Sequence, residues 1–162
     1  MADAVRFEVH GLVALGDRLE GLQYDMKRKG GRFALRKAAN VIRDKAKANA
    51  KRIDDPTSAA DISENMAVRW SGRHFKQTGD LKFRVGIMGG AGGRANSEAL
   101  AGLPGGDTRH WRHVEFGTEH TRAQPFMRPA LAESIQAASE EFVRQYHKSL
   151  DRALKRAAKA SQ

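Results

Sequence analysis

The sequence predicts an α+β fold in which a small antiparallel sheet packs against long amphipathic helices. Apolar residues alternate with polar ones over 62–70 and 81–87, as in strands, and recur at spacings of three and four elsewhere, as in helices. The length of 162 residues suits one domain spanning 1–162, and neither an internal repeat nor a second domain is evident.

The first third of the chain predicts a strand and two helices. Residues 5–9 alternate between apolar and polar side chains, which indicates a short strand. Leucines at intervals of three and four predict a helix over 12–26, and the glycine pair at 30–31 interrupts it as a kink or a short break. A basic, alanine-rich helix is predicted over 34–51, and Pro56 lies in the polar stretch that stops it.

The middle of the chain predicts a hairpin. Residues 62–70 and 81–87 each place their large apolar side chains on one parity, and we expect them to pair as antiparallel strands joined by a broad loop over 72–79. Residues 89–108 are rich in glycine and alanine without periodicity, which predicts a mobile loop that becomes ordered on assembly.

The last element is predicted to be a long helix. Pro129 suits its first turn, because proline fixes a helical φ where no intrahelical N–H bond is needed. Apolar side chains then continue a helical stripe nearly to the C-terminus: Leu131, Ile135, Ala138, Phe142, Tyr146, Leu150 and Leu154.

The positive charge is concentrated in one segment. The net charge is +10, and residues 27–52 hold eleven lysines and arginines against Asp44 alone. This pattern favours contact with DNA or with an acidic protein surface, although a solvated helix face is an equally simple interpretation. Only Phe33 is aromatic in that segment, so stacking on bases is poorly provided for. The candidate contact residues of the basic helix are Arg32, Arg36, Lys37, Arg43, Lys45, Lys47 and Lys51.

Several classes of function find no support in the residues. There is no cysteine, which excludes disulfides and thiolate metal sites, and no apolar run has the length of a signal peptide or a membrane span. The glycines at 89–93 lack the Gly-Lys-Ser/Thr ending of a phosphate-binding loop. We therefore expect no bound nucleotide or other cofactor and no contact with a membrane.

Metal binding and catalysis are not expected either. His110, His113, Glu115 and His120 lie close together in the sequence, but nearby arginines would repel a cation. The serines have no sequence context of an activated nucleophile. We therefore expect no metal site, no catalytic residues and no enzymatic activity.

The most distinctive stretch joins a short apolar element to the last helix. Residues 113–118 read His-Val-Glu-Phe-Gly-Thr, and residues 124–131 read Gln-Pro-Phe-Met-Arg-Pro-Ala-Leu. We expect Glu115 to pair with Arg128 across the turn. We also expect Phe116 and Phe126 to pack under the hairpin face made by Phe83, Val85 and Ile87. The residues that define this motif are Glu115, Phe116, Gly117, Thr118, Pro125, Phe126, Arg128 and Pro129.

These motifs resemble the neck or minor tail-component family of Hong Kong 97-type and lambda-like phages, the gene-product-ten-like family. The resemblance includes the Gly-Leu at 11–12, the basic helix at 34–51 and the Thr-Gly-Asp-Leu at 78–81. It also includes the Glu-Phe-Gly-Thr box at 115–118 and the Pro-Phe-Met-Arg-Pro-Ala run at 125–130.

The resemblance implies a virion structural protein, made in the cytoplasm of a host bacterium. Such subunits form a homo-oligomeric ring at the head-to-tail junction, around the DNA channel and between head-closure and tail-terminator proteins. The sequence leaves open the number of subunits and whether the basic helix faces DNA or protein. A free-standing, basic protein that binds DNA without sequence specificity is the alternative.

Overall fold

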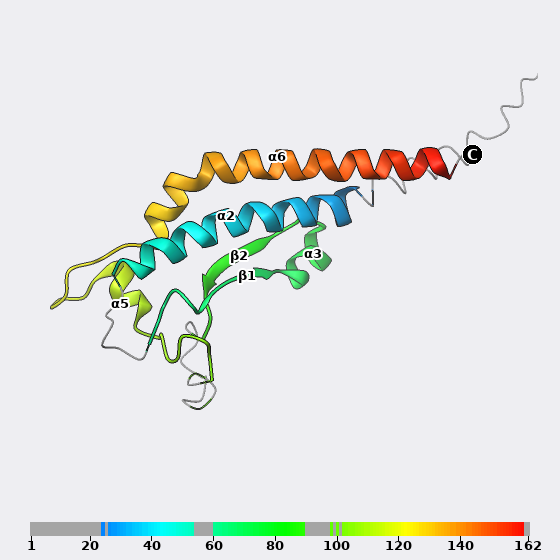
Figure 1. Cartoon of the computed structure of the whole chain (residues 1–162). Helices are drawn as coiled ribbons and strands as arrows, with labels where there is room; N and C mark the ends of the chain where they lie inside the picture. The colour runs from blue at the N-terminus through cyan, green and yellow to red at the C-terminus, as the bar shows by residue number, and fades with distance from the viewer. Residues whose placement is uncertain are drawn as a thin grey trace, which may run out of the picture.

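The computed structural model describes residues 24, 26–53, 60–89, 98, 100 and 102–160. Two long helices lie side by side, and a two-stranded sheet lies against one of them (Figure 1). The α+β fold expected from the sequence is therefore confirmed. The strand expected at 5–9 and most of the helix expected at 12–26 lie outside the described residues.

The first long helix begins in a widened turn. A π-helix, η1 (Met26–Gly31), runs directly into α2 (Arg32–Lys51), so the glycine pair widens the helix and does not break it. Both glycines are close to other elements: a Cβ on Gly30 would lie 3.1 Å from Cβ of Ser149, and one on Gly31 would lie 2.9 Å from Leu81 Cδ1. Glycine at these positions therefore allows the backbone to approach its neighbours closely.

The second long helix, α6 (Met127–Lys159), runs antiparallel to α2. Lys45 pairs with Glu133 near one end of the two helices, and Gly30 approaches Ser149 near the other. Pro129 lies in the first turn of α6, as expected. The buried residues of both helices are small, which permits close packing of the backbones: Ala34, Ala38, Ala39, Ala46 and Ala50 on α2, and Ala130, Ser134, Ala138 and Ala153 on α6.

The apolar stripe predicted for the last helix therefore coincides only partly with the buried face of α6. Ala138 is buried, but Leu131 is 50% exposed, Ile135 60% and Leu154 50%. The interface between the helices uses the neighbouring row of small residues, because the alanines of α2 match small side chains at close approach.

The predicted hairpin is present. Strands β1 (Met66–Trp70) and β2 (Phe83–Ile87) are antiparallel, with Val68 opposite Val85 and Trp70 opposite Phe83. The broad loop expected between them is instead a short helix, α3 (Gly72–Thr78), which ends at Gly79 in the left-handed region with φ 74°.

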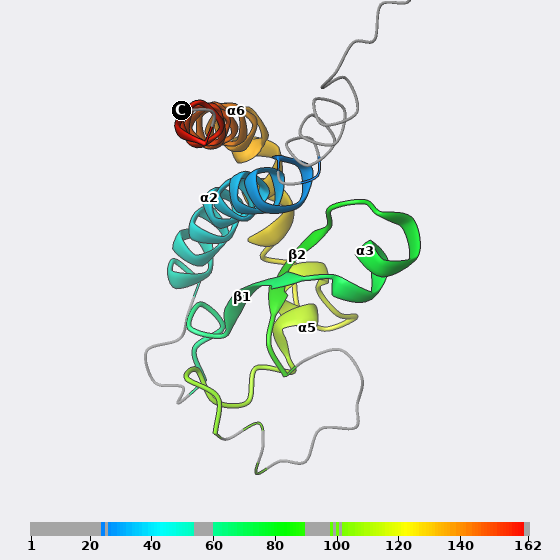
Figure 2. The same cartoon turned by 90° about the vertical axis from the view of Figure 1, so that its right-hand side faces the viewer.

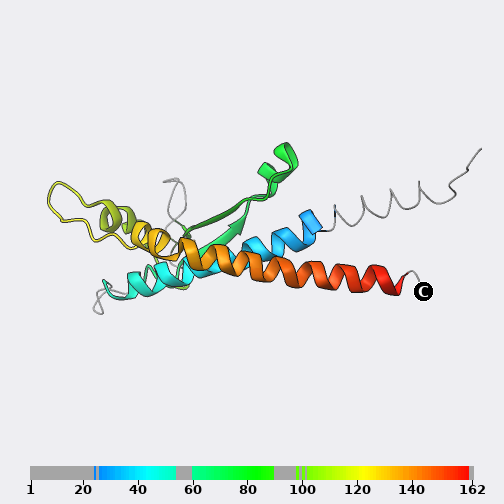
Figure 3. The same ribbon diagram turned by 90° about the horizontal axis from the view of Figure 1, so that it is seen from above.

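The elements form three layers, with α2 between α6 and the sheet, as the view along the helices shows (Figure 2). Seen from above, the hairpin and α3 project to one side of the helix pair (Figure 3). The main core cluster lies where the end of α2, the start of β1 and the start of α6 meet. Its buried members are Ala46, Ala50, Ile62, Met66, Phe126 and Ala130.

Candidate functional site

The carboxylate of Glu115 holds the start of α6. Glu115 lies in α5 (Trp111–Phe116) and is only 1% exposed. Its Oε2 accepts hydrogen bonds from the backbone N–H of Phe126 at 2.7 Å and of Met127 at 2.9 Å, and its Oε1 accepts one from the N–H of Arg128 at 3.1 Å. This buried carboxylate and its three donors are named here the Glu115 clamp.

The clamp supplies the hydrogen-bond acceptors that α6 lacks in its own first turn. The first N–H groups of a helix have no intrahelical acceptor, and a side chain at the N-cap or an acid in the first turn usually satisfies them. At α6 the N-cap residue, Phe126, makes no side-chain cap, and the first turn contains no acid. Glu115 therefore caps α6 from another element and also places a negative charge at the positive end of the helix dipole.

Arg128 completes the clamp. Its Nε lies 3.2 Å from Glu115 Oε1, and its Nη2 donates to the backbone carbonyl of Glu115 at 3.0 Å. The pair expected between these residues across the turn is thus present. Burial by itself raises the pKa of the Glu115 carboxyl, but the hydrogen bonds from Met127, Phe126 and Arg128 outweigh burial and leave the pKa below its usual value.

The Gly-Thr half of the motif forms the turn that brings the chain back beside α5. Gly117 has φ 78°, and a Cβ there would lie 2.9 Å from the carbonyl oxygen of Thr121. Thr118 then closes the turn, because its Oγ1 accepts from the N–H of His120 at 3.2 Å and of Thr121 at 3.0 Å. The N–H of Gln124 donates to the carbonyl of Val114 at 2.8 Å, which brings the chain back beside α5.

The two phenylalanines of the motif have different environments. Phe126 is fully buried in the core cluster, against which Ile87 of the hairpin also packs. The expected packing is thus found for Ile87, whereas Phe83 and Val85 lie outside this cluster. The expectation for Phe116 is wrong: its side chain is 62% exposed. Phe116 follows Glu115 on a short helix, so turning Glu115 inward points the next side chain outward. The guanidinium of Arg128 lies over the Phe116 ring at 5.1 Å.

A second buried polar group fixes the end of the glycine-rich segment. Asn65 is fully buried; its Nδ2 donates to the carbonyl of Gly106 and to Thr108 Oγ1, both at 2.8 Å, and its Oδ1 accepts from the N–H of Gly105 at 2.9 Å. A Cβ on Gly105 would collide with the carbonyl oxygen of Asp61. Residues 90–97, 99 and 101 lie outside the described residues, so the expected mobility of 89–108 stays a prediction.

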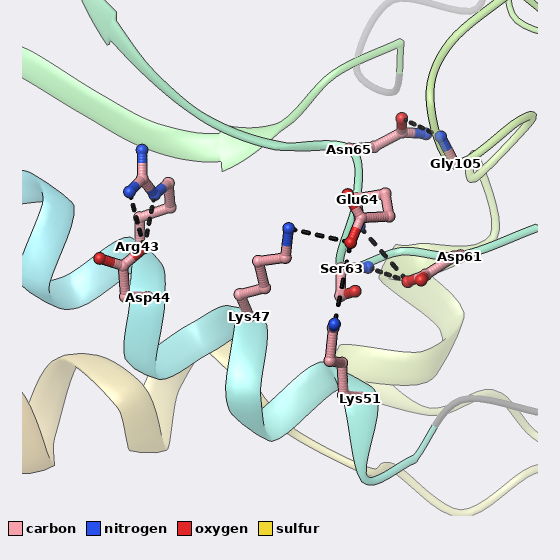
Figure 4. A network of polar contacts seen from close by, with 9 residues as sticks. All are labelled: Arg43, Asp44, Lys47, Lys51, Asp61, Ser63, Glu64, Asn65 and Gly105. Carbon is pink, nitrogen blue, oxygen red and sulfur yellow. Dashed lines mark hydrogen bonds and ion pairs between the residues drawn. The ribbon is translucent and has the colours of Figure 1, made fainter.

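The C-terminal half of the basic helix is paired with acids of the same chain. Lys45 contacts Glu133 at 2.7 Å, Lys47 contacts Glu64 at 2.9 Å, and Lys51 approaches the same Glu64 carboxylate at 3.8 Å. Figure 4 shows Glu64 between the two lysines, and also the pairing of Arg43 with its neighbour Asp44 at 2.6 Å. These four cations therefore present less positive charge to a partner than the sequence suggests.

The N-terminal half of the basic region faces aromatic rings. The guanidinium of Arg32 lies over the indole of Trp70, 4.5 Å from the ring centroid, and that of Arg28 lies 5.7 Å from the ring of Phe75. Trp70 also contacts Phe75 and Phe83, at centroid distances of 5.5 and 5.1 Å. Sequence reasoning found only Phe33 beside these cations and missed the three rings brought there by β1, α3 and β2.

The remaining basic candidates also lie on the surface. Lys37 is exposed, and its ammonium lies 5.6 Å from the ring of Phe33 on the same helix. Arg36 is exposed and lines a hollow of about 580 Å³ between α2 and the hairpin, together with Arg28, Arg32, Trp70 and Phe83.

The histidines at 110–120 do not form a cluster with other ligands. Among the described residues, no group of three or more histidines, aspartates or glutamates is placed to hold a metal ion. Glu115, which the sequence places among them, is instead bound to the start of α6. In the described part of the chain, every helix is too short or too polar to span a membrane.

A comparison with protein families identifies a match to a phage family. Residues 14–117 match the family described as "Bacteriophage HK97-gp10, putative tail-component". The matched region covers the basic helix, the hairpin and the Glu-Phe-Gly part of the clamp motif. Neither the curated proteins nor the solved structures include a significant match.

Proposed function

This chain belongs to the HK97-gp10-like family of phage tail components, and on that premise we propose that it is a non-enzymatic subunit of a homo-oligomeric ring at the head-to-tail junction. A tail component is a virion-associated structural protein. We further propose that the subunit surrounds the DNA channel and that its neighbours are the head-closure and tail-terminator proteins.

An exposed apolar row along α6 supports the proposed ring. Leu131, Ile135, Val143 and Leu154 are each at least half exposed. Their spacings of four, eight and eleven residues turn the row gradually around the helix, by about 140° in all. Three of them directly follow a buried small residue of α6, so the row lies on one flank of the buried face along the helix. Scattered apolar residues are ordinary on a protein surface, but a row along a 33-residue helix is typical of a contact surface.

The clamp makes this row a rigid surface. Glu115 and Arg128 fix the start of α6 to α5, and small residues pack the helix closely along α2. A ring closes when one surface of a subunit meets a different surface of the next copy, with the same contact repeated around the axis. We assign the apolar row to one side of that contact.

The test is the native mass of the purified chain and of a row variant. We expect the wild-type chain to form one closed oligomer, and Ile135→Gln with Val143→Gln to lower its mass toward the 17.9 kDa monomer. The control is Ala137→Gln with Lys148→Gln, because these exposed positions lie on another flank of α6. A wild-type monomer that associates only when DNA is added would favour the free-standing DNA-binding protein instead.

A further inference from the structure

Three arginines form an exposed row that has no acidic partner among the described residues. Arg28, Arg32 and Arg36 follow one another at intervals of four, and all three are exposed. Within the described ranges, none of them forms an ion pair with a carboxylate or donates a side-chain hydrogen bond, unlike Lys45, Lys47 and Lys51 farther along the helix. A guanidinium carries five N–H donors, so many donors remain available at this surface.

Aromatic rings hold two of these arginines in place. Arg32 lies on Trp70, and Arg28 lies near the rings of Phe75 and Tyr24, at 5.7 and 5.3 Å. A guanidinium stacked on a ring keeps the N–H donors in its plane free for a second contact. The rings thus reduce the side-chain entropy that each arginine would lose on binding an anion.

The surroundings add further positive charge. The hairpin and α3, residues 66–87, contain five lysines and arginines and one acid, Asp80. Lys76 of α3 lines a second hollow, of about 380 Å³, together with Arg28 and Arg32.

We infer that the row formed by Arg28, Arg32 and Arg36, together with Lys76, binds backbone phosphates of double-stranded DNA. Successive arginines on the row are one helical turn apart, about 6 Å along the axis, which suits a polymer of repeated anions better than a single small ligand. The face of Trp70 is occupied by Arg32, so the contact is with phosphates and carries no base specificity.

The inference rests on the proposed function in one respect, which is that a subunit around the DNA channel contacts DNA. The contact residues all belong to one copy of the chain, and the exposed apolar row of α6 does not include them. Loss of the phosphate contact and loss of the ring can therefore be observed separately.

The experiment measures binding of the full chain to a short labelled DNA duplex over a series of salt concentrations. We expect Arg32→Gln with Arg36→Gln to weaken binding about tenfold or more, since both substitutions remove phosphate contacts. We also expect the slope of log K against log salt to become shallower by about 1.8, because each phosphate contact contributes about 0.9.

The matched control is Arg112→Gln with Arg122→Gln, which removes the same charge from exposed positions in and after α5. We expect this variant to keep the wild-type slope. Equal losses in both variants would overturn the inference, because net charge alone would then explain binding. Displacement of the duplex by polyglutamate at equal charge would also overturn it, in favour of an acidic protein partner.

The native mass of the Arg32→Gln, Arg36→Gln variant is measured in the same samples. An unchanged oligomer with weakened DNA binding supports the phosphate site independently of the ring. A wild-type chain that binds duplex through these arginines as a monomer would support the site and contradict the ring.

Discussion

Replacing Glu115 with glutamine tests the clamp without changing the size of the side chain. The amide keeps one acceptor oxygen and puts an NH₂ group where the second oxygen accepts hydrogen bonds from backbone N–H groups. At least one buried N–H then loses its acceptor, and the remaining contacts lose the carboxylate charge. Since a hydrogen bond to a charged group contributes about 1.5–3 kcal/mol, we expect Glu115→Gln to cost about 2–4 kcal/mol in free energy of unfolding.

The assay is thermal unfolding followed by circular dichroism at several pH values. A loss of this size should lower Tm by about 5–15 °C for a chain of this length. The pKa of Glu115 is lowered in the folded state, so its stabilisation is fully present above the unfolded pKa of about 4.3 and is lost as pH falls through the folded pKa. The difference in Tm between wild type and Glu115→Gln should therefore be largest near neutral pH and shrink in acid.

The control is Glu119→Gln, because Glu119 is an exposed carboxylate in the loop that links α5 to α6. If Glu115→Gln and Glu119→Gln melt at the same temperature, the clamp does not stabilise the fold. A difference that persists unchanged in acid would show that the carboxylate charge is not responsible.

Two further stability predictions concern the aromatic pair and the glycine-rich segment. Phe126→Ala should lower the free energy of unfolding by about 3–5 kcal/mol, because it empties a fully buried position. Phe116→Ala should lower it by about 1 kcal/mol or less, because the Phe116 side chain is exposed and contacts Arg128. Equal losses for the two variants in urea unfolding would contradict this difference. Gly105→Ala should cost on the order of 1–3 kcal/mol, because its Cβ collides with Asp61. It should also speed hydrogen exchange at the Asp61 amide, which donates to Gly105; unchanged exchange would contradict the expected displacement.

The secondary structure followed from local patterns where one face of an element is buried. Alternation over 81–87 predicted a strand, and its pairing with the earlier run is confirmed by the register of Val68 with Val85. The spacing of alanines predicted α2. The pairing of Glu115 with Arg128 could be anticipated because the motif places an acid and a base at either end of the loop between two helices.

Tertiary packing determines which row of the last helix is buried, and local sequence patterns do not show it. The last helix has two adjacent rows, one of small residues and one of large apolar residues, and periodicity alone favours the larger side chains. Only the alanine surface of α2 shows that the small row is buried and Ile135 is exposed.

The aromatic rings beside the arginines were missed for a similar reason. Trp70 and Phe75 are far from Arg32 in sequence, and their proximity depends on how the hairpin packs on α2. A partial signal existed in the sequence: arginines at intervals of four, and one aromatic residue among the apolar positions of each strand, Trp70 and Phe83. The distribution of charge was also misleading, because Glu64 and Glu133 come from other elements to pair with the lysines.

Electron microscopy of the purified chain, together with its native mass, tests the proposed ring directly. We expect closed rings of uniform diameter in the absence of nucleic acid, with a mass that is a whole multiple of 17.9 kDa. A chain that remains monomeric at every concentration, and stays outside purified phage tails when mixed with them, would contradict the proposed ring.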